Sequence, residues 1–518
     1  MGRTNTVATV TAASYFLLTT DYGFEPNAFD PSDMASREAP GTAQQAIEYE
    51  ITSVPTGYKY NNDEILNQID SIHVTGGGEF DTESLFILVE NIFNHAALIV
   101  GSYVPGAQLP LENMEDKDMA PSVCFNSPFC TLKQISCKMA SKAWGEVNAH
   151  ETTLAILDML SSYSCDARAV MTLAAFTLDY GKFWLLMQIH TSDQLAKSMA
   201  FLKGLPVLAE HSGLQKRQQA LAELNNLIKV TLEVIKCIFE LEKLPNYGRE
   251  NVPALSKALY HIPLDSYWVI RTVIGCSTQM TGLISDEDQA VDLSSLALNL
   301  YHILNNLKRQ LNICKQQIEE TETVAYQMLT NLFQIHPKID EVFKALCYGK
   351  SNVLQLIDGS NEVYFDILKH KYVLLLISGP DITDKDLSTL KQLRKEIGSR
   401  GKVVWVPIVV QSKTTINIER KFRSLGSEVP LYIVHQFLPI PGIKFIREEW
   451  QFTNKPIVVV INPKVKVEHH ILVEQIRGIN SFPCFRKKRI EWLVGGLCSC
   501  VCQCCLCVHV PTSKCCQR

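Results

Sequence analysis

The sequence lacks long hydrophobic runs. No uninterrupted apolar segment reaches the roughly eighteen residues that a membrane-spanning helix needs, and the most apolar region, residues 152–187, is interrupted by charged side chains. The N-terminus also lacks a basic start followed by an apolar core, which a secretory signal would show. These two absences predict a cytoplasmic chain with no stable membrane span.

An excess of charge of one sign is also missing. The 518 residues include 49 basic and 54 acidic side chains, which gives a formal net charge of −5. Proteins that bind nucleic acid usually present a basic face to the phosphates, so this balance argues against nucleic acid as a partner. A chain this close to neutrality has little self-repulsion, and self-association is therefore permitted.

Motifs that carry catalysis are absent as well. The sequence contains no GxSxG, no HExxH and no EF-hand loop. We therefore expect no catalytic residues, no bound cofactor and no enzymatic activity. Disulfides are rare in the cytosol, so most of the 17 cysteines are predicted to be reduced. Five of them occur at helical positions and are predicted to be small core residues: Cys165, Cys237, Cys276, Cys314 and Cys347.

Two stripes of apolar residues at helical spacing indicate that residues 61–345 form a large all-helical domain. The first stripe consists of Leu221, Leu224, Ile228, Ile235 and Ile238. The second consists of Leu300, Ile303, Leu307, Leu311, Cys314 and Ile318. Both could be coiled-coil seams, but neither extends well beyond about three heptads, which favours packing inside one domain. Residues 1–60 have no sustained period and are predicted to be disordered.

A different pattern follows in residues 369–494. Residues 372–377, 402–410 and 457–461 are apolar runs typical of strands covered on both faces. Residues 384–397 carry leucines at helical spacing. The order strand, helix, strand and late strand predicts a thioredoxin-like α/β domain. The fold class is thus α plus α/β, with residues 346–368 expected to form a linker and a short helix.

A thioredoxin-like domain normally carries a Cys-x-x-Cys pair directly after its first strand. Here the same place reads Ser378, Gly379, Pro380 and Asp381. Dithiol exchange needs an attacking thiolate and a second, resolving thiol, so this degenerate position predicts a domain without redox activity. By analogy with the fold, Pro456 is predicted to follow a cis peptide bond and to face the loop at Gly379 and Pro380.

Residues 495–518 form a cysteine-rich tail. Its six closely spaced cysteines are Cys498, Cys500, Cys502, Cys504, Cys505 and Cys507. Such spacings bind soft metals as thiolate clusters, and the same thiols could accept palmitate. A third interpretation is a divergent terminus under no functional demand. The sequence leaves these three interpretations open.

Separated blocks of this chain resemble the sieve element occlusion family of plant phloem proteins. The blocks read DEILNQIDSIHVTGGGEFDTESLFILVENIF near the start, and YVLLLISGPDIT, KVVWVPIV, IKFIREEWQF and NKPIVVVINPKVKV later on. The resemblance runs from about Asp63 to Val494, and the tail replaces the C-terminal segment that members of this family normally carry.

The resemblance implies a structural protein of phloem sieve elements. Such a protein would assemble with itself and with paralogues into filaments and would contribute to sieve-plate occlusion after wounding. Two alternatives rest on the residues themselves. One is a thioredoxin-like oxidoreductase, which the missing dithiol argues against, and the other is a metal-binding protein that acts through its tail.

Overall fold

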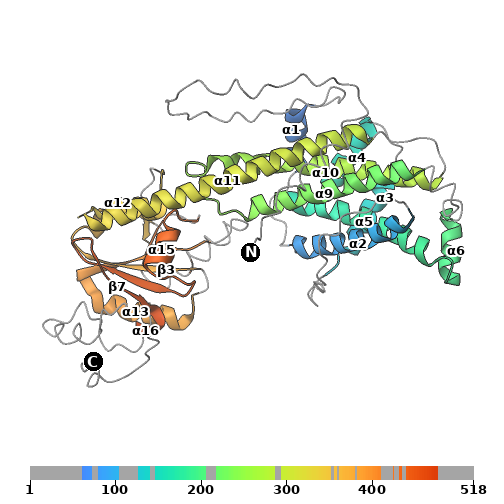
Figure 1. Cartoon of the computed structure of the whole chain (residues 1–518). Coiled ribbons are helices and arrows are strands. Elements are labelled where there is room, and N and C mark those ends of the chain that lie inside the picture. The colour runs from blue at the N-terminus through green and yellow to red at the C-terminus, as the bar shows by residue number, and fades with distance from the viewer. Residues whose placement is uncertain are drawn as a thin grey trace, which may run out of the picture. The chain divides into compact units, whose positions relative to one another are not determined.

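The computed structural model describes residues 61–72, 80–103, 126–140, 146–205, 217–285, 293–335, 337–351, 355–358, 361–379, 382–409, 424, 431–434 and 439–476. These residues form a helical domain followed by an α/β domain with one mixed sheet (Figure 1). The predicted fold class, α plus α/β, is therefore confirmed. The predicted disordered segment 1–60 and the cysteine-rich tail lie outside the described residues.

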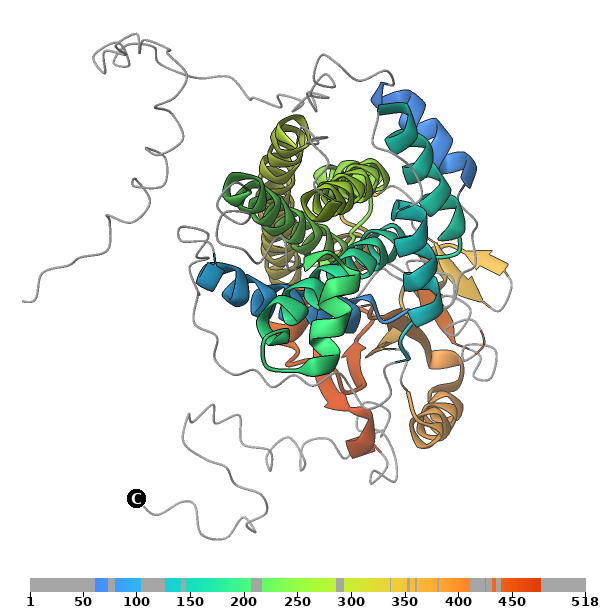
Figure 2. The same ribbon diagram turned by 90° about the vertical axis from the view of Figure 1, so that its right-hand side faces the viewer.

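The helical domain consists of long helices packed side by side, which Figure 2 views obliquely toward their ends. Its described helices are α1 (Asn62–Ile72), α2 (Thr82–Tyr103), α3 (Phe129–Ala140), α4 (Glu146–Met159), α5 (Cys165–Ile189), α6 (Gln194–Leu202), α9 (Gln218–Lys243), α10 (Pro253–Ser285) and α11 (Ser294–Gln334). Helix α5 packs against α2, α3, α9 and α10. Because neighbours cover it on several sides, most of its side chains are buried, including Tyr180 and Trp184.

The two apolar stripes found in the sequence belong to α9 and α11. All the stripe residues of α9 are buried, and those of α11 are buried except Ile303, which is partly buried. Both stripes join one core cluster that also contains residues of α2, α4, α5 and α10. They therefore pack inside one helical domain, which confirms the preferred interpretation over separate coiled-coil seams.

Helix α11 takes part in two cores. Its residues from Leu296 to Ile318 pack in the helical domain, whereas Leu329 is buried in a cluster with residues of the α/β domain. Near its C-terminus, Phe333 stacks on Phe445, with 5.7 Å between the ring centroids. The hydroxyl of Tyr326 donates a hydrogen bond of 2.7 Å to a carboxylate oxygen of Glu449. One helix of 41 residues thus belongs to both domains.

The α/β domain is built on a seven-stranded sheet in the order β2-β1-β5-β4-β3-β6-β7. The strands are β1 (Leu356–Asp358), β2 (Asn361–Val363), β3 (Tyr372–Ser378), β4 (Gly401–Pro407), β5 (Tyr432–Val434), β6 (Ile457–Ile461) and β7 (Val467–Leu472). The α-helices of this region are α12 (Ile339–Phe343), α13 (Asp384–Ile397), α15 (Ile443–Glu449) and α16 (Val473–Ile476). It also contains the π-helix η2 (Lys344–Tyr348) and the 3-10 helices η3 (Phe365–Leu368) and η4 (Gly398–Arg400).

The centre of the sheet has the thioredoxin-like arrangement. Strand β3 pairs in parallel with β4 after the crossover helix α13, and it pairs antiparallel with β6 on its other side. Strand β7 then pairs antiparallel with β6. Alternate residues of β3 point to opposite faces of the sheet. Leu374 and Leu376 pack in the core under α13, and Leu375 and Ile377 pack in the core under α15 and η2.

The range predicted as a linker and short helix, residues 346–368, also contains strands. Strand β1 pairs antiparallel with β5, and β2 extends the sheet as its outermost strand. Each strand is only three residues long, which is too short to produce a recognisable alternation in the sequence. Pairing with the existing edge of the sheet, rather than local propensity, makes these residues extended.

Candidate functional site

The first residue of the position expected to hold a dithiol is buried in the core. Ser378 is the last residue of β3 and is fully buried, and its Oγ accepts a hydrogen bond of 2.8 Å from the indole Nε1 of Trp405. Its carbonyl accepts a second bond from the backbone N–H of Ile408. Gly379 is half-buried, while Pro380 and Asp381 lie outside the described residues. The serine hydroxyl thus holds the indole of the neighbouring strand in place.

The predicted cis bond before Pro456 is wrong. No cis peptide bond occurs among the described residues, so Lys455 and Pro456 are joined in trans. The chain reaches β6 through Gln451 and Asn454, both of which have positive φ. The left-handed backbone conformation of these two residues changes the direction of the chain before the proline. The Pro456 carbonyl then accepts the N–H of Val473 at 2.9 Å.

Pro456 does lie beside the start of the crossover helix. A groove at this place is lined by Thr383, Asp384, Lys385, Asp386, Lys455, Pro456, Leu472, Val473 and Glu474. The Thr383 hydroxyl caps α13 by accepting the N–H of Asp386, and the Asp386 carboxylate accepts the N–H of Thr383. Lys455 and Glu474 form an exposed ion pair at 3.2 Å. Three charged side chains of the groove, Asp386, Lys455 and Glu474, therefore already have partners, and no thiol lines it.

The cysteines inside the described range are reduced. Cys237, Cys276, Cys314 and Cys347 are buried and free, as predicted, and Cys165 is half-buried. Burial raises the pKa of the Cys276 thiol to about 12 and that of the Cys314 thiol to about 11, so neither is a reactive thiolate near neutral pH. Across the described ranges, no cluster of three or more metal-ligating side chains occurs. The six tail cysteines lie outside those ranges.

The most regular polar feature is one that the sequence reading missed. We call it the charge ladder, and its members are Glu83, Glu90, Glu233, Lys236, Glu240, Lys243, Lys308 and Lys315. Carboxylates of α2 meet lysines of α9, and carboxylates of α9 meet lysines of α11. The eight residues form four rows of two, in which the second residue follows the first by seven positions, or about two helical turns. The rows are Glu83 and Glu90, Lys236 and Lys243, Glu233 and Glu240, and Lys308 and Lys315.

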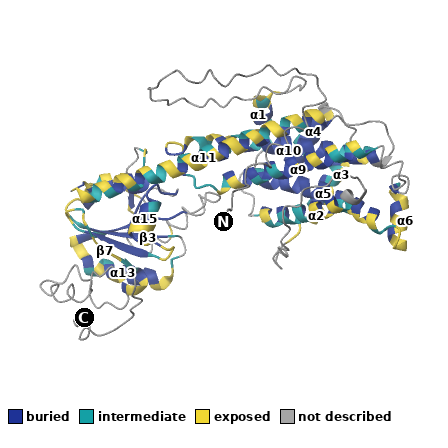
Figure 3. Cartoon of the chain, in the orientation of Figure 1, coloured by how far each residue is buried: buried dark blue, intermediate teal, exposed yellow. Residues whose placement is uncertain are grey.

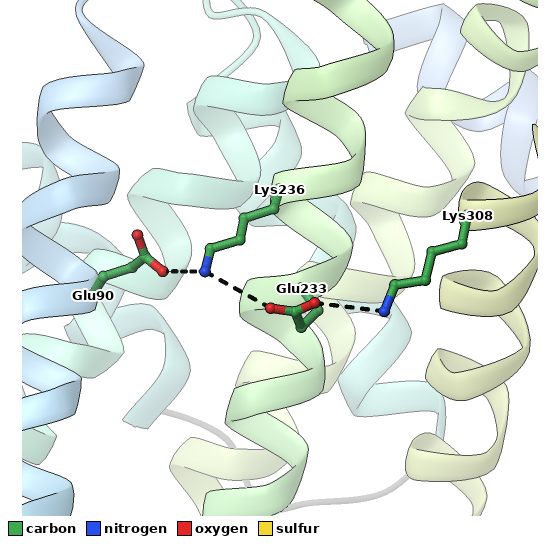
Figure 4. Close-up of polar contacts among 4 residues, drawn as sticks. All are labelled: Glu90, Glu233, Lys236 and Lys308. Atoms are coloured by element: carbon green, nitrogen blue, oxygen red, sulfur yellow. Dashed lines mark ion pairs between the residues drawn. The ribbon is translucent and has the colours of Figure 1, made fainter. Parts of the chain in front are cut away.

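The distances in the ladder are those of direct ion pairs. The Lys236 Nζ lies 2.6 Å from a Glu90 oxygen and 3.7 Å from Glu233, and Glu233 lies 3.5 Å from the Nζ of Lys308 (Figure 4). Two helical turns further along the same helices, the Lys315 Nζ lies 2.9 Å from a carboxylate oxygen of Glu240. Burial opposes the charge on Lys236, but the two carboxylates outweigh it and raise the pKa of this lysine.

The ladder flanks an apolar contact between the same helices. The rings of Phe86 on α2 and Phe239 on α9 meet edge to face, with centroids 5.3 Å apart. The pair Glu83–Lys243, at 3.0 Å, and the pair Glu90–Lys236 lie on either side of this contact in the sequence. Exposed ion pairs contribute only about 0.2–1 kcal/mol each. Their alternating signs nevertheless fix the register of α2 on α9 and of α9 on α11, because a slip by one turn would place like charges together.

A second polar feature fixes the junction between the two domains. Asn251, in the connection before α10, is buried. Its Oδ1 accepts the N–H of Lys350 at 2.8 Å, and its Nδ2 donates to the carbonyls of Tyr247 and Tyr348. Gly349 lies against this side chain with φ of 59° and ψ of −115°, and a Cβ added there would clash with Asn251 Oδ1.

The residues of the charge ladder have a recognisable spacing in the sequence, whereas the junction residue Asn251 has none. Glutamates and lysines seven residues apart on three predicted helices are a pattern that can be counted. Which rows face each other depends on how the helices pack. A single Asn251 in a polar connection carries no such pattern.

These features define a two-domain protein. A helical domain with interhelical ion pairs is joined through a shared helix to a thioredoxin-like domain with no thiol at its exchange position. The chain belongs to the sieve element occlusion family, because the family model for the sieve element occlusion N-terminus matches residues 60–336, more than half of the chain. No helix in the described ranges is long and apolar enough to span a membrane.

Three relatives from Arabidopsis thaliana are similar over most of this chain. Protein sieve element occlusion B is 33% identical over 473 residues, which are 84% of this chain and 63% of that protein. Protein sieve element occlusion A is 26% identical over 500 residues, or 88% of this chain and 56% of the relative. Protein sieve element occlusion C is 26% identical over 458 residues, or 82% and 66%. The chain thus matches less than two thirds of each relative's length.

Proposed function

We propose that this chain is a structural phloem protein that assembles with itself and with paralogues into filaments in the cytoplasm of sieve elements, and that it contributes to sieve-plate occlusion after wounding. The observation that carries the proposal is the family match over residues 60–336. This range coincides with the helical domain, from α1 to the end of α11. The names of the three relatives supply the sieve element and the occlusion.

Two physical features support a structural role. Ion pairs and one continuous apolar core hold the helices in a defined register, and α11 extends from this core into the second one. Such a body transmits force without internal sliding, as a filament subunit must. The low net charge of −5 leaves little long-range repulsion between copies. The segment limits 1–60, 61–345, 346–368, 369–494 and 495–518 remain part of this proposal.

The alternative, a thioredoxin-like oxidoreductase, has less support. In the described part of the thioredoxin-like domain, Ser378 stands where the attacking thiol would be, and its hydroxyl is buried against Trp405. Exchange would need an accessible thiolate there. We therefore propose that the domain is not an enzyme and that it supplies packing surface only.

Two measurements on the purified full-length chain test the proposal. Negative-stain microscopy and sedimentation at rising concentration, with and without a full-length family member, should show assemblies that grow with concentration. A chain that stays monomeric under both conditions, at low and at moderate salt, would refute the assembly function. In parallel, insulin reduction by the chain should not exceed that of an equal concentration of free thiol. Turnover well above this level would favour the oxidoreductase.

A further inference from the structure

Helix α3 carries two exposed thiols on one face. Cys130 and Cys137 are exposed and reduced, whereas every other cysteine within the described ranges is buried or half-buried. The two are seven residues apart, which is about 20° short of two full helical turns, so both side chains leave the same face of α3. Figure 3 shows α5 and α10, which pack against α3, mostly in the colour of buried residues. We call the face that carries the two cysteines the thiol face.

The two thiols are too far apart to bond to each other. Two helical turns rise roughly 10 Å along the helix axis, whereas the Cα atoms of a disulfide lie at most about 7 Å apart. Within the described part of the chain, neither thiol belongs to a cluster of three or more metal-ligating side chains. Each thiol must therefore take a partner of its own, and both partners would project from the same side of α3.

The thiol face is also basic and partly apolar. Lys133 is exposed and lies between the two thiols, three residues after Cys130 and four before Cys137. A second lysine, Lys138, is in the last turn of α3, and the helix contains no acidic residue. At the start of the helix, Phe129 is 54% exposed. Lysines beside an exposed aromatic side chain are typical of helices that lie on the surface of an anionic membrane.

The carboxylate that accepts a hydrogen bond from α3 already has a cation beside it. The Ser136 hydroxyl donates to Asp179 of α5, and the same carboxylate pairs with Lys182 at 3.6 Å. Lys182 therefore offsets the negative charge of Asp179. The positive charge of Lys133 remains available to an anionic surface that approaches the thiol face.

We propose that Cys130 and Cys137 accept long-chain fatty acyl groups and that the doubly acylated α3 holds the chain at an anionic membrane surface. In each transfer, the thiol sulfur bonds to the carbonyl carbon of an acyl-coenzyme A thioester. The bond from this carbon to the coenzyme sulfur breaks, and the thiol proton passes to the released coenzyme thiol. No oxidant or reductant is consumed. Cysteines on amphipathic helices are known acceptors for this reversible modification.

The spacing of the two thiols suits stable attachment. A single acyl chain gives only marginal membrane binding, with a constant of about 10⁴ M⁻¹, and a stable attachment needs two signals. Two thiols on one face deliver both chains to the same membrane, and Lys133 adds attraction to anionic lipids. The inference goes beyond the proposed filament function, because it concerns where the chain is held and does not require assembly.

The first test asks whether the two thiols are acylated in cells. The full-length chain is expressed in plant cells fed with an alkyne-tagged palmitate analogue, and mass spectrometry locates the label that hydroxylamine releases. We expect label on both α3 cysteines and none there in C130S/C137S. The control C237A changes a buried cysteine and should keep the label on α3. Absence of label, or label confined to cysteines outside α3, would overturn the inference.

The second test measures membrane attachment. The purified full-length chain is acylated with palmitoyl-coenzyme A and floated with vesicles of four parts phosphatidylcholine to one part phosphatidylserine. The doubly acylated chain should bind at least about tenfold more tightly than the singly acylated C130S or C137S chain. K133Q should weaken binding to these vesicles but not to vesicles of phosphatidylcholine alone. Circular dichroism checks that the variants keep their helix content.

Two outcomes of the second test would overturn the inference. One is equal flotation of the acylated unmodified chain and of C130S/C137S treated in the same way. The other is a product in which α3 thiols form disulfides between two copies and carry no acyl group, which would assign the thiol face to a contact between chains. Neither outcome decides whether the chain forms filaments, so the assembly function is judged by its own measurements.

Discussion

Reversing the charge of Lys236 should destabilise the helical domain. This lysine lies between Glu90 of α2 and Glu233 of its own helix, and it is 44% exposed while Glu90 is 25% exposed. K236M removes two ion pairs, each contributing about 0.2–1 kcal/mol, so we expect a loss of about 0.5–1 kcal/mol. K236E also adds repulsion from two carboxylates. Like charges about 4 Å apart near a surface repel by roughly 1–4 kcal/mol before side chains rotate away, so we expect a total loss of about 1–2 kcal/mol.

A double-mutant cycle measures this contribution directly. The free energies of unfolding in urea for the unmodified chain, E90Q, K236M and E90Q/K236M should give a coupling of about 0.2–1 kcal/mol at low salt, because each single variant removes the Glu90–Lys236 ion pair without adding a new repulsion. At about 1 M salt the Debye length falls to about 3 Å, and the coupling should shrink toward zero. The pKa of Lys236 is raised in the folded state. Its contribution is therefore complete below the unfolded pKa of about 10.5 and is lost as the pH rises through the folded value.

Hydrogen exchange shows whether the ladder holds α2 in place. K236E should speed exchange in α2 more than in α5, because α2 loses one of its two ion pairs to α9. K182M is the matched control, since Lys182 is also about half exposed but pairs with Asp179 on its own helix at 3.6 Å. It should leave α2 exchange unchanged. A low-salt coupling of zero between positions 90 and 236, or equal effects of K182M and K236M, would refute the register argument.

Three further predictions concern buried groups. Gly349 and Gly398 have almost the same backbone angles, but only at Gly349 does an added Cβ meet a neighbour. The loss of stability in G398A therefore reflects backbone strain alone. In urea unfolding, G349A should lose at least about 1 kcal/mol more than G398A. Burial raises the pKa of Asp265 to about 8. Between about pH 4 and pH 8 the Asp265 carboxyl is protonated in the folded state but ionised in the unfolded state. The free energy of unfolding therefore falls as the pH rises through this window. Accordingly, D265N should gain in melting temperature over the unmodified chain from pH 5 to pH 8, and a constant difference would contradict this. S378A should lose about 1–2 kcal/mol in urea unfolding because the indole N–H of Trp405 is left without its acceptor. S378T keeps the hydroxyl but adds a methyl group. A smaller loss in S378T than in S378A would show that the hydrogen bond matters more than the tight packing around this side chain.

Local patterns in the sequence determined the long helices and the central strands of the two domains. The apolar stripes of α9 and α11 predict helices because a helix that buries one face repeats its apolar residues every three or four positions. The runs at 372–377 and 457–461 predict strands covered on both faces, and the structure places them as β3 and β6 at the centre of the sheet. The missing dithiol is likewise a property of the sequence, because no packing can supply a thiol at Ser378.

Tertiary structure alone decided the features that join distant segments. Strands β1 and β2 are extended because an edge strand is available to pair with them. Pro456 is in trans, which is the favoured state of a bond before proline, and the fold analogy that suggested a cis bond did not include the turn through Gln451 and Asn454. The charge ladder needs α2 antiparallel and α11 parallel to α9, and Asn251 needs Lys350, 99 residues away, to satisfy its buried oxygen. The period of apolar residues along a helix or strand indicates which face of that element is buried. It does not indicate which other segment packs against that face.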